Sequence, residues 1–542
     1  MYCDTPQVNQ LTALLQAHGI HNIVVCPGSR NGTIVHNLHA AGAAFSLYPA
    51  TDERSAAFVA LGICLATQEP AAVCVTSGSA LLGCLPAVAE ACYRHLPLLV
   101  ISADRPANWI GQLDGQTLQQ EGALLPYCNT HNVCVPHSSE DSWANNRRIN
   151  AALNALQTPA CGPVHINVQI AEPMFSFTTK QLPNERVVRC LNIATQYTLP
   201  NELLQKISEA RLPALLIGQY ERGDLRHEID QLDNNGQLLV LPEVIADVPG
   251  NWRMEVIDQL DEATTTLLPD LVIQLGGNFV HKRFKRLLRQ ASGCRVIRIG
   301  HDSEVPDTFC HLYTYIQAPE QPILQEFCTH LPHQHTGVLK AQRAYVQQYE
   351  ALYQTQIASC ILNGQLTFAN VMVLLKQALQ QCTEPFSLHL ANSTAVRAAG
   401  KVFEAGNFPI FCNRGVNGIE GSLSTAVGYA LKMWGLSIAV IGDLSFFYDA
   451  NALWNTQLPA NLRVLLLNNG HGAIFDHLPG LDQSPARNRY IAAGEQHFSA
   501  EGIAHTFGAD YLRATSIQDL ITALPQWLSA TNKARILEVC LP

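Results

Sequence analysis

The stretch GDLSFFYDANALWNTQLPANLRVLLLNNGHGAIF, Gly442–Phe475, decides the fold of the last third of the chain. One apolar run, SIAVIG, ends at Asp443, and a second, LRVLLL, ends at Asn468 and Asn469. Short apolar runs of this kind are typical of buried strands in a parallel sheet, and we predict that YDANALWNTQ is the helix that connects them. The ligand crevice of an open parallel sheet lies beyond the carboxyl ends of its strands. Both side chains, of Asp443 and Asn469, are therefore expected at one edge.

Oxygen ligands collect at this predicted edge. A carboxylate, an amide oxygen and a backbone carbonyl just beyond them suit Mg²⁺, which keeps places for water and for phosphate oxygens. Upstream, NRGVNGIEGSLSTAVGYA is a glycine-rich loop that opens a helix, and such a loop suits a phosphate group near backbone N–H donors. The alternative is that Asp443 caps the following helix and the asparagines form a turn. The glycine-rich loop favours the metal and phosphate site.

Strands and helices alternate along the whole chain, which predicts parallel sheets covered by helices on both faces. A length of 542 residues is too great for one core and predicts about three domains. The polar segments FTTKQLPNERVV and LPHQHTGVLKAQ are the expected linkers. We therefore expect an α/β protein with three consecutive parallel-sheet domains at residues 1–180, 190–332 and 345–542.

The composition excludes several classes of protein. A net charge of -10 argues against a nucleic-acid binder, so an anionic ligand must be held by locally placed arginines. The 17 cysteines form no CxxC pair, and the N-terminus has neither a basic nor an apolar targeting segment. No apolar run approaches the roughly 18 residues of a spanning helix. We expect a reduced, cytoplasmic protein with no transmembrane segment.

The pair GDLS and NNGHG resembles the metal-binding signature of thiamine diphosphate enzymes. The resemblance implies thiamine diphosphate and Mg²⁺, or Mn²⁺ in its place, with the metal held by Asp443, Asn469 and the carbonyl of His471. Two positions depart from the signature: Leu444 replaces a glycine, and His471 stands where glycine is commoner. A histidine tolerates positive φ better than most residues and would donate only its backbone oxygen.

Glu53, in TDERSAAFVALG, is the expected catalytic residue. These enzymes need a carboxyl group that hydrogen-bonds the aminopyrimidine of the cofactor in apolar surroundings, and Glu53 follows a strand and begins an apolar helix. The alternative is a first-turn acid that complements the helix dipole. CPGSRNG, TDERSAAFVALG and TSGSALLGCLPAVAEA follow in the order of a pyrimidine-binding domain. The resemblance then implies a pyrimidine, a central and a diphosphate domain, and a homodimer or homotetramer with active sites at the dimer interface.

Over nearly its full length the chain resembles the 2-succinyl-5-enolpyruvyl-6-hydroxy-3-cyclohexene-1-carboxylate synthases, transferases of menaquinone biosynthesis. The motifs that carry this resemblance are CPGSR, TDERSAAF, TSGSA, SADRP, DGQTLQQ, HKRFKRLL, NSTAVR, CNRGVNGIEGSLSTA, GDLSFFYD and NNGHGAIF. The family decarboxylates 2-oxoglutarate and adds the resulting succinyl semialdehyde carbanion to isochorismate. Both substrates are dicarboxylates, which planar guanidinium groups hold in a fixed orientation.

The resemblance also assigns residues to each ligand. The residues implied for isochorismate are Arg30, Arg105, Gln116, Lys282 and Arg283, and Ser29 is implied as a further substrate-binding residue. Those implied for 2-oxoglutarate are Ser393, Arg397 and Arg414. Those implied for the cofactor are Glu53, Gly418, Ile419, Gly442, Asp443, Leu444, Ser445, Asn469, Ile474, Phe475 and Leu478. In particular, Ile419 would support the bent cofactor, and Ile474, Phe475 and Leu478 would keep water from the reaction.

A purely structural role is the alternative for some of these residues. HKRFKRLLRQ is also the pattern of a solvated helical face, Ser29 could only shape its turn, and Arg54 could pair with a surface acid.

Three other functions also stay open. A pyruvate enzyme such as an acetolactate synthase would need fewer arginines. A dinucleotide-linked oxidoreductase is weakly indicated, because LIGQYERG and LGGNFV lack GxGxxG. A non-catalytic scaffold is disfavoured by the joint presence of Glu53, Asp443 and Asn469.

Overall fold

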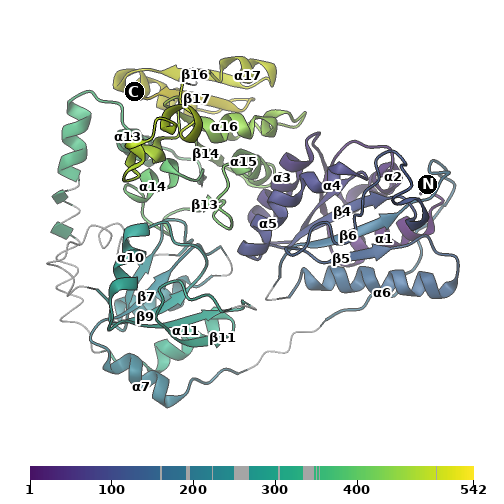
Figure 1. Cartoon of the computed structure of the whole chain (residues 1–542), viewed down its shortest axis with the longest axis horizontal. Coiled ribbons are helices and arrows are strands. Elements are labelled where there is room, and N and C mark those ends of the chain that lie inside the picture. Colours follow the sequence, from purple (N-terminus) through teal and green to yellow (C-terminus); the bar gives the residue numbers. More distant parts are fainter. Residues whose placement is uncertain are drawn as a thin grey trace.

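Three parallel sheets, each flanked by helices, make up the protein (Figure 1). The structure is a computed structural model, and it describes residues 1–158, 161–190, 196–221, 224–248, 268–302, 305–333, 347–348, 351–352, 354–495 and 497–542. The predicted class, α/β with three consecutive parallel-sheet units, is confirmed. The domain boundaries stay predictions, and most of LPHQHTGVLKAQ lies outside the described residues.

The first sheet has the strand order β2-β1-β3-β4-β6-β5. Its strands are β1 (Asn22–Val25), β2 (Ser46–Pro49), β3 (Ala71–Val75), β4 (Leu98–Asp104), β5 (Thr130–Val133) and β6 (Val164–Gln169). Its helices are α1 (Pro6–Ala17), α2 (Gly32–Ala40), α3 (Glu53–Thr67), α4 (Ser79–Gly83), α5 (Leu85–Arg94) and α6 (Ser139–Ala155). The edge strand β5 was not expected from the sequence, because it is short and only partly buried, whereas β2 is the strand expected before Glu53.

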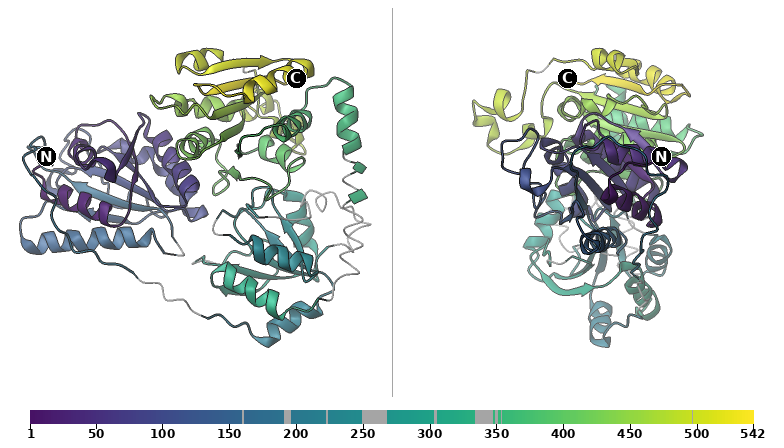
Figure 2. Two further views of the ribbon diagram at one scale, coloured as in Figure 1. Left: turned by 180° about the vertical axis from the view of Figure 1, so that it is seen from behind. Right: turned by 90° about the vertical axis from the view of Figure 1, so that its right-hand side faces the viewer.

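The central sheet has the order β11-β10-β9-β7-β8. Its strands are β7 (Pro213–Ile217), β8 (Leu239–Pro242), β9 (Leu271–Leu275), β10 (Arg295–Gly300) and β11 (Leu312–Gln317). The described helices around it are α7 (Asn201–Glu209), α8 (Arg226–Asn234), α10 (Lys282–Gln290) and α11 (Glu320–His330). Figure 2 shows this unit below the third domain, with the first domain to one side in the left view.

The third sheet has the order β13-β12-β14-β15-β17-β16. Its strands are β12 (Phe386–Leu390), β13 (Ile410–Cys412), β14 (Leu436–Gly442), β15 (Leu462–Asn468), β16 (Asp510–Ala514) and β17 (Arg535–Cys540). Its main helices are α13 (Phe368–Gln380), α14 (Thr394–Gly400), α15 (Ser422–Ala430), α16 (Asp443–Tyr448), α17 (Glu501–Thr506) and α18 (Ile517–Leu528). Counted within its own unit, each strand of this sheet has the same place as its counterpart in the first sheet. The first and third domains therefore share one topology.

The predicted crossover helix YDANALWNTQ is wrong in its position. The helix after β14 begins five residues earlier, at Asp443, and ends at Tyr448, and only a short 3-10 turn follows at Ala450–Leu453. Asp443 is thus the first residue of the helix, and its carboxylate accepts a hydrogen bond from the Leu444 N–H.

The first and third domains meet through equivalent helices, α3 and α15, which each follow the second strand of their sheet. They lie side by side at the junction in Figure 1. Gly62 and Gly428 stand where the two helix backbones come closest. One hydrophobic core, which includes Phe58, Leu61 and Leu423, runs through both domains. The junction is therefore as well packed as a domain interior.

The predicted linker FTTKQLPNERVV is held against the first domain. Asn146, Asn150 and Asn154, one turn apart on α6, donate side-chain hydrogen bonds to the carbonyls of Arg186 and Val188. Because these donors are spaced by four residues, they lie along one face of the helix. The segment is a connection bound along α6, and its polar sequence was correctly interpreted as lying outside the sheets.

Candidate active site

Asp443 and Asn469 lie together at the carboxyl ends of β14 and β15, as predicted from the sequence. Asp443 is 5% exposed, and its Oδ2 accepts hydrogen bonds from the N–H of Gly470 at 2.6 Å and of Asn469 at 3.2 Å. Burial raises the pKa of Asp443, although backbone donors oppose the shift. A buried carboxylate therefore sits beside an asparagine at the sheet edge.

The turn after β15 is shaped by Gly470, which has a φ of +73°. The sequence analysis expected positive φ at His471, but the left-handed position is the glycine before it. Nε2 of His471 lies 2.7 Å from Oδ2 of Asp476. Partial burial lowers the pKa of His471, but hydrogen bonds to Asp476 and to the Asn469 carbonyl raise it above its usual value overall. The His471 side chain is thus held by Asp476, while its carbonyl belongs to the turn.

The glycine-rich loop before α15 stays a predicted phosphate site, but one N–H donor of the helix start is already used. The Ser424 N–H, in the first turn of α15, donates to Oδ2 of Asp449 at 2.8 Å, and the Ser424 hydroxyl donates to Oδ1 at 2.8 Å. A β-carbon on Gly421 would lie 2.4 Å from the Phe58 ring of α3. A carboxylate and an aromatic ring therefore pack against the start of α15.

The loop itself is ordered by Asn392. Its amide nitrogen donates to the carbonyls of Asn413 at 2.5 Å and Gly418 at 2.6 Å. The Ser445 hydroxyl donates to the carbonyl of Ile419, which ties the loop to the first turn after β14. Ile419 is nevertheless 42% exposed, beside this polar edge. An exposed apolar side chain on a fixed loop is a candidate contact for a bound ligand.

Three residues predicted for 2-oxoglutarate come together next to this loop. Arg397 donates to the Ser393 carbonyl at 2.6 Å, and Nη1 of Arg414 donates to Oδ1 of Asn392 at 3.2 Å. Burial and the like charge of Arg414 lower the pKa of Arg397. Nε of Arg414 is buried and has no hydrogen-bond partner among the described residues. Two crowded guanidinium groups of this kind can receive an anion.

The central domain adds Lys285, which the sequence analysis did not single out. Burial, and then the charge of Arg414, lowers the pKa of Lys285. The predicted Lys282 and Arg283 begin the same helix, α10, which lies beside α14 and far from α2 in Figure 1. Within one chain they therefore lie on the side of Arg414. The signal that could have indicated Lys285 is its spacing, one turn after His281, on the face that carries Phe284 and Leu288.

Glu53 begins α3 at the carboxyl-end edge of the first sheet. The helix is capped by Asp52, whose carboxylate accepts a hydrogen bond from the N–H of Arg54 at 2.9 Å. The Glu53 side chain is therefore not the N-cap of α3. Burial raises the pKa values of Cys26 and Cys84, and the charge of Glu53 adds to this. The described residues provide no hydrogen bond or ion pair to the Glu53 carboxylate. The buried thiols of Cys26 and Cys84 lie near this carboxylate.

Arg30 and Arg105, predicted for isochorismate, share one carboxylate. Nη2 of Arg30 lies 3.1 Å from Oε1 of Glu172, and Nη1 of Arg105 lies 3.8 Å from the same oxygen. Arg105 also pairs with Asp114 at 3.1 Å. Ser29 and Gln116, from the same predicted set, are exposed in the neighbouring loops. The sequence analysis missed Glu172, and nothing in its local pattern indicates this contact.

Arg54 does not pair with a surface acid. Its Nη2 donates to the Tyr448 carbonyl at 2.7 Å, and its guanidinium lies 4.6 Å from the centre of the Tyr448 ring. In the described part of the chain it forms no ion pair within hydrogen-bond distance. Arg54 is a contact between the first and third domains.

Each of the two related sheet edges borders a cavity. One, of about 400 Å³, is lined by Asn469, His471 and Arg487 among others. The other, of about 350 Å³, is lined by Gly28, Thr51 and Trp454 among others. No cluster of three His, Cys, Asp or Glu side chains that could bind a metal occurs among the residues described. The metal ligands predicted from the sequence would not form such a cluster, because only Asp443 contributes a carboxylate and the other two ligands are an amide oxygen and a backbone carbonyl.

The fold and these two edges define a thiamine diphosphate-dependent enzyme: paired α/β domains of equal topology, a buried aspartate and asparagine at one edge, and a helix-opening glutamate at the other. Residues 8–124 match the family model "Thiamine pyrophosphate enzyme, N-terminal TPP binding domain". The chain belongs to the family of 2-succinyl-5-enolpyruvyl-6-hydroxy-3-cyclohexene-1-carboxylate synthases. No helix in the described part of the chain is long and apolar enough to cross a membrane.

Similarity to curated synthases of that name extends over almost the whole chain. The relative from Phocaeicola vulgatus is 39% identical over 99% of this chain and 96% of its own length. That from Bacteroides thetaiotaomicron is 40% identical over 97% of this chain and 93% of its own. That from Flavobacterium johnsoniae is 32% identical over 98% and 95%.

Proposed function

We propose that this protein decarboxylates 2-oxoglutarate and joins the remaining four-carbon unit to isochorismate, giving 2-succinyl-5-enolpyruvyl-6-hydroxy-3-cyclohexene-1-carboxylate and CO2 in menaquinone biosynthesis. The observation that carries the proposal is the similarity, over 97 to 99% of the chain, to synthases of that name. A dinucleotide-linked oxidoreductase and a non-catalytic scaffold have no such support. The site residues below are assigned on the same basis.

Thiamine diphosphate, when bound, supplies the carbon nucleophile for this reaction. Mg²⁺, or Mn²⁺, would be held by the Asp443 carboxylate, Oδ1 of Asn469 and the His471 carbonyl, which are hard oxygen donors. Support comes from the sheet edge, where burial and two backbone donors keep the Asp443 carboxylate in one orientation. Gly442, Leu444 and Ser445 would contact the cofactor from the same turn.

Glu53 would hydrogen-bond the aminopyrimidine of the cofactor and help move its proton. Its free carboxylate and its neutral neighbours, Cys26 and Cys84, suit that role. In the described residues of one chain, no hydrogen bond joins Glu53 to Asp443 or Asn469. As the resemblance to thiamine diphosphate enzymes implies, we place Glu53 of one protomer opposite the Asp443 edge of another, so that a homodimer is the smallest active unit and a tetramer is a pair of such dimers.

The substrates would be bound by separate arginines. Arg397 and Arg414, with Ser393, would orient 2-oxoglutarate. The buried Nε of Arg414 and the two neighbouring guanidinium charges favour an anion here. Arg30 and Arg105, with Ser29 and Gln116, would hold isochorismate, joined by Lys282 and Arg283 from the protomer that carries Arg414. Exposed or half-buried apolar residues would exclude water around the reacting carbon, namely Ile419, Ile474, Phe475 and Leu478. The reaction is placed in the cytoplasm.

One assay tests the proposal directly. Purified protein with thiamine diphosphate and Mg²⁺ should release CO2 from 2-oxoglutarate, and adding isochorismate should accelerate the release and yield the six-membered-ring product. Pyruvate is the matched control, because an acetolactate-type enzyme would use it faster. Greater turnover of pyruvate, or no product with isochorismate, would contradict the proposal. Sedimentation velocity on the same sample tests the homodimer.

A further inference from the structure

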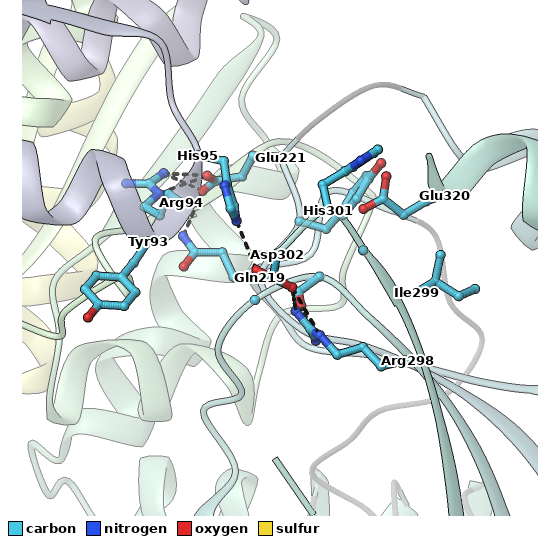
Figure 3. Close-up of a pocket in the computed structure, with 14 residues that line it drawn as sticks. Tyr93, Arg94, His95, Gln219, Glu221, Arg298, Ile299, His301, Asp302 and Glu320 are labelled. Carbon is cyan, nitrogen blue, oxygen red and sulfur yellow. Dashed lines mark hydrogen bonds and ion pairs between the residues drawn. The ribbon is translucent and has the colours of Figure 1, made fainter. Parts of the chain in front are cut away.

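The central domain has the crevice of a ligand-binding sheet. Its strand order reverses between β7 and β9, and ligands of open α/β sheets bind outside the strand ends at such a point. The two loops there, after β7 and after β9, approach closely: a β-carbon on Gly218 would lie 2.3 Å from the Gly277 carbonyl. Figure 3 shows the pocket at this place, with Arg94 and His95 of the first domain entering it.

A guanidinium group from the first domain occupies this crevice. Arg94, the last residue of α5, places Nη2 2.6 Å from both carboxylate oxygens of Glu221, and its Nε lies 3.1 Å from Oε2 (Figure 3). The side chains of Arg94 and Glu221 are 2% and 4% exposed. A forked, buried ion pair of this kind fixes both position and orientation. Arg94 thus takes the place at which other doubly wound sheets hold a separate ligand.

The same arginine also reaches the third domain. Nη1 of Arg94 donates to Oδ1 of Asn413 at 2.8 Å and lies 3.4 Å from Glu90, one helical turn earlier. The Glu90 carboxylate, 1% exposed, accepts from the N–H of Gly415 at 2.9 Å and of Val416 at 2.8 Å. All three domains therefore meet in one buried network.

The third-domain part of the network is the loop that carries the candidate site. Arg414 lies between Asn413 and Gly415, and Ile419 follows four residues after them. A second central-domain side chain, Asn278, donates to the Arg414 carbonyl at 2.6 Å. Backbone and side chain of this short segment are held on both sides, so the direction of the Arg414 guanidinium depends on the network.

We propose that Arg94 and Glu90 are positioning residues for the loop 413–419, and that the central-domain crevice serves to bind Arg94 as an internal ligand. The proposal rests on the proposed function, in which Arg414 orients 2-oxoglutarate. Neither residue touches the substrates. Loss of Arg94 or Glu90 should weaken the binding of 2-oxoglutarate and leave the binding of isochorismate at Arg30 and Arg105 unchanged.

The test compares Arg94→Met and Glu90→Gln with Arg298→Met. Arg298 is a matched control, because it is a buried arginine of the same pocket that pairs with Asp302 at 2.6 Å, and among the described residues it has no hydrogen bond or ion pair to the loop 413–419. Both first-domain variants should raise the KM for 2-oxoglutarate at least about tenfold and leave that for isochorismate within about twofold. Arg298→Met should change neither by more than about twofold.

Hydrogen exchange of the loop peptide provides a readout that does not depend on activity. In the cofactor-loaded protein, Arg94→Met and Glu90→Gln should speed amide exchange at Gly415 and Val416, and Arg298→Met should not. Unchanged exchange in folded Glu90→Gln would overturn the inference, and so would an equal KM increase in the control. If Arg94→Met does not fold, Glu90→Gln decides. A wild-type protein that releases no CO2 from 2-oxoglutarate would end the proposed function, and the exchange data would still test the positioning.

Discussion

Gly62 of α3 and Gly428 of α15 face each other's helix at the crossing that joins the first and third domains. A β-carbon on Gly62 would lie 2.0 Å from the Thr425 carbonyl, and one on Gly428 would lie 2.0 Å from the Val59 carbonyl. The two helices occupy equivalent places in sheets of equal topology. Their contact is therefore one of backbone against backbone, which requires glycine at both positions.

Alanine at either glycine should destabilise the protein. The added methyl group cannot fit, so the helices must separate, at a cost of about 1–3 kcal/mol or more for overpacking. We expect Gly62→Ala and Gly428→Ala to unfold at lower urea concentration. Gly502→Ala is the control, since no atom lies within 4 Å of the added β-carbon, and its stability should stay equal or rise by up to about 1 kcal/mol. Equal losses in all three variants would contradict the close crossing.

Asp449 should make stability depend on pH. Burial raises its pKa from 3.8 to about 6, although the hydrogen bonds from Ser424 oppose the shift. Between these two values the folded state binds more protons than the unfolded state, so this contribution to stability is present below about pH 4 and is lost as pH rises to 6. The difference between these two pKa values corresponds to a loss of unfolding free energy on the order of 3 kcal/mol.

The measurement is the free energy of unfolding of wild type and of Asp449→Asn between pH 4 and 7. Because asparagine does not titrate, the stability of wild type relative to the variant should fall as pH rises through this range. Parallel curves for the two proteins would show that Asp449 is not buried as described.

Much of this architecture could be predicted from the sequence because its signals are local. The apolar runs that end at Asp443 and Asn469 gave the central strands of the third sheet, and the edge position of both side chains followed from parallel topology. Short edge strands such as β16 escaped notice, since they are only half-buried and their residues do not alternate clearly. The start of α16 was misplaced because a helix of six residues is too short to show a clear helical period in the sequence.

The buried network at the domain junction could not be predicted in the same way. Glu90 and Arg94 are spaced as an ordinary ion pair on a helix, and their partners lie 127 to 326 residues away. Their burial results from the docking of three domains, which no local pattern encodes. The same holds for Asp449, which accepts a hydrogen bond from the Ser424 N–H in the first turn of α15.

Glu172 should compete with isochorismate for its arginines. Its carboxylate contacts both Arg30 and Arg105, but its side chain is 66% exposed, so these pairs contribute only about 0–1 kcal/mol and a substrate carboxylate can displace them. Glu172→Gln is expected to lower the KM for isochorismate by up to about fivefold and to leave that for 2-oxoglutarate unchanged. Steady-state kinetics with each substrate varied in turn provides the measurement. A higher KM would mean instead that Glu172 holds the arginines in place.

Arg105 and Arg397 should separate the two substrates. Arg105 lies at the first-domain edge with Glu172, and Arg397 lies beside Arg414 in the third domain. We expect Arg105→Ala chiefly to raise the KM for isochorismate and Arg397→Ala chiefly to weaken the use of 2-oxoglutarate, because each removes one carboxylate contact. The two constants are measured for both variants. Similar effects on both substrates would refute the division.

Glu53→Gln should nearly abolish turnover in a folded protein. Glutamine keeps the size of the side chain but cannot share a proton with the aminopyrimidine, so CO2 release from 2-oxoglutarate should fall by orders of magnitude. Stability should be preserved, because the cap of α3 is provided by Asp52 and the Glu53 carboxylate has no partner among the described residues. Glu69→Gln, at an exposed site just after the same helix, is the control and should retain wild-type rates. Comparable CO2 release by both variants, with equal melting temperatures, would remove Glu53 from the reaction.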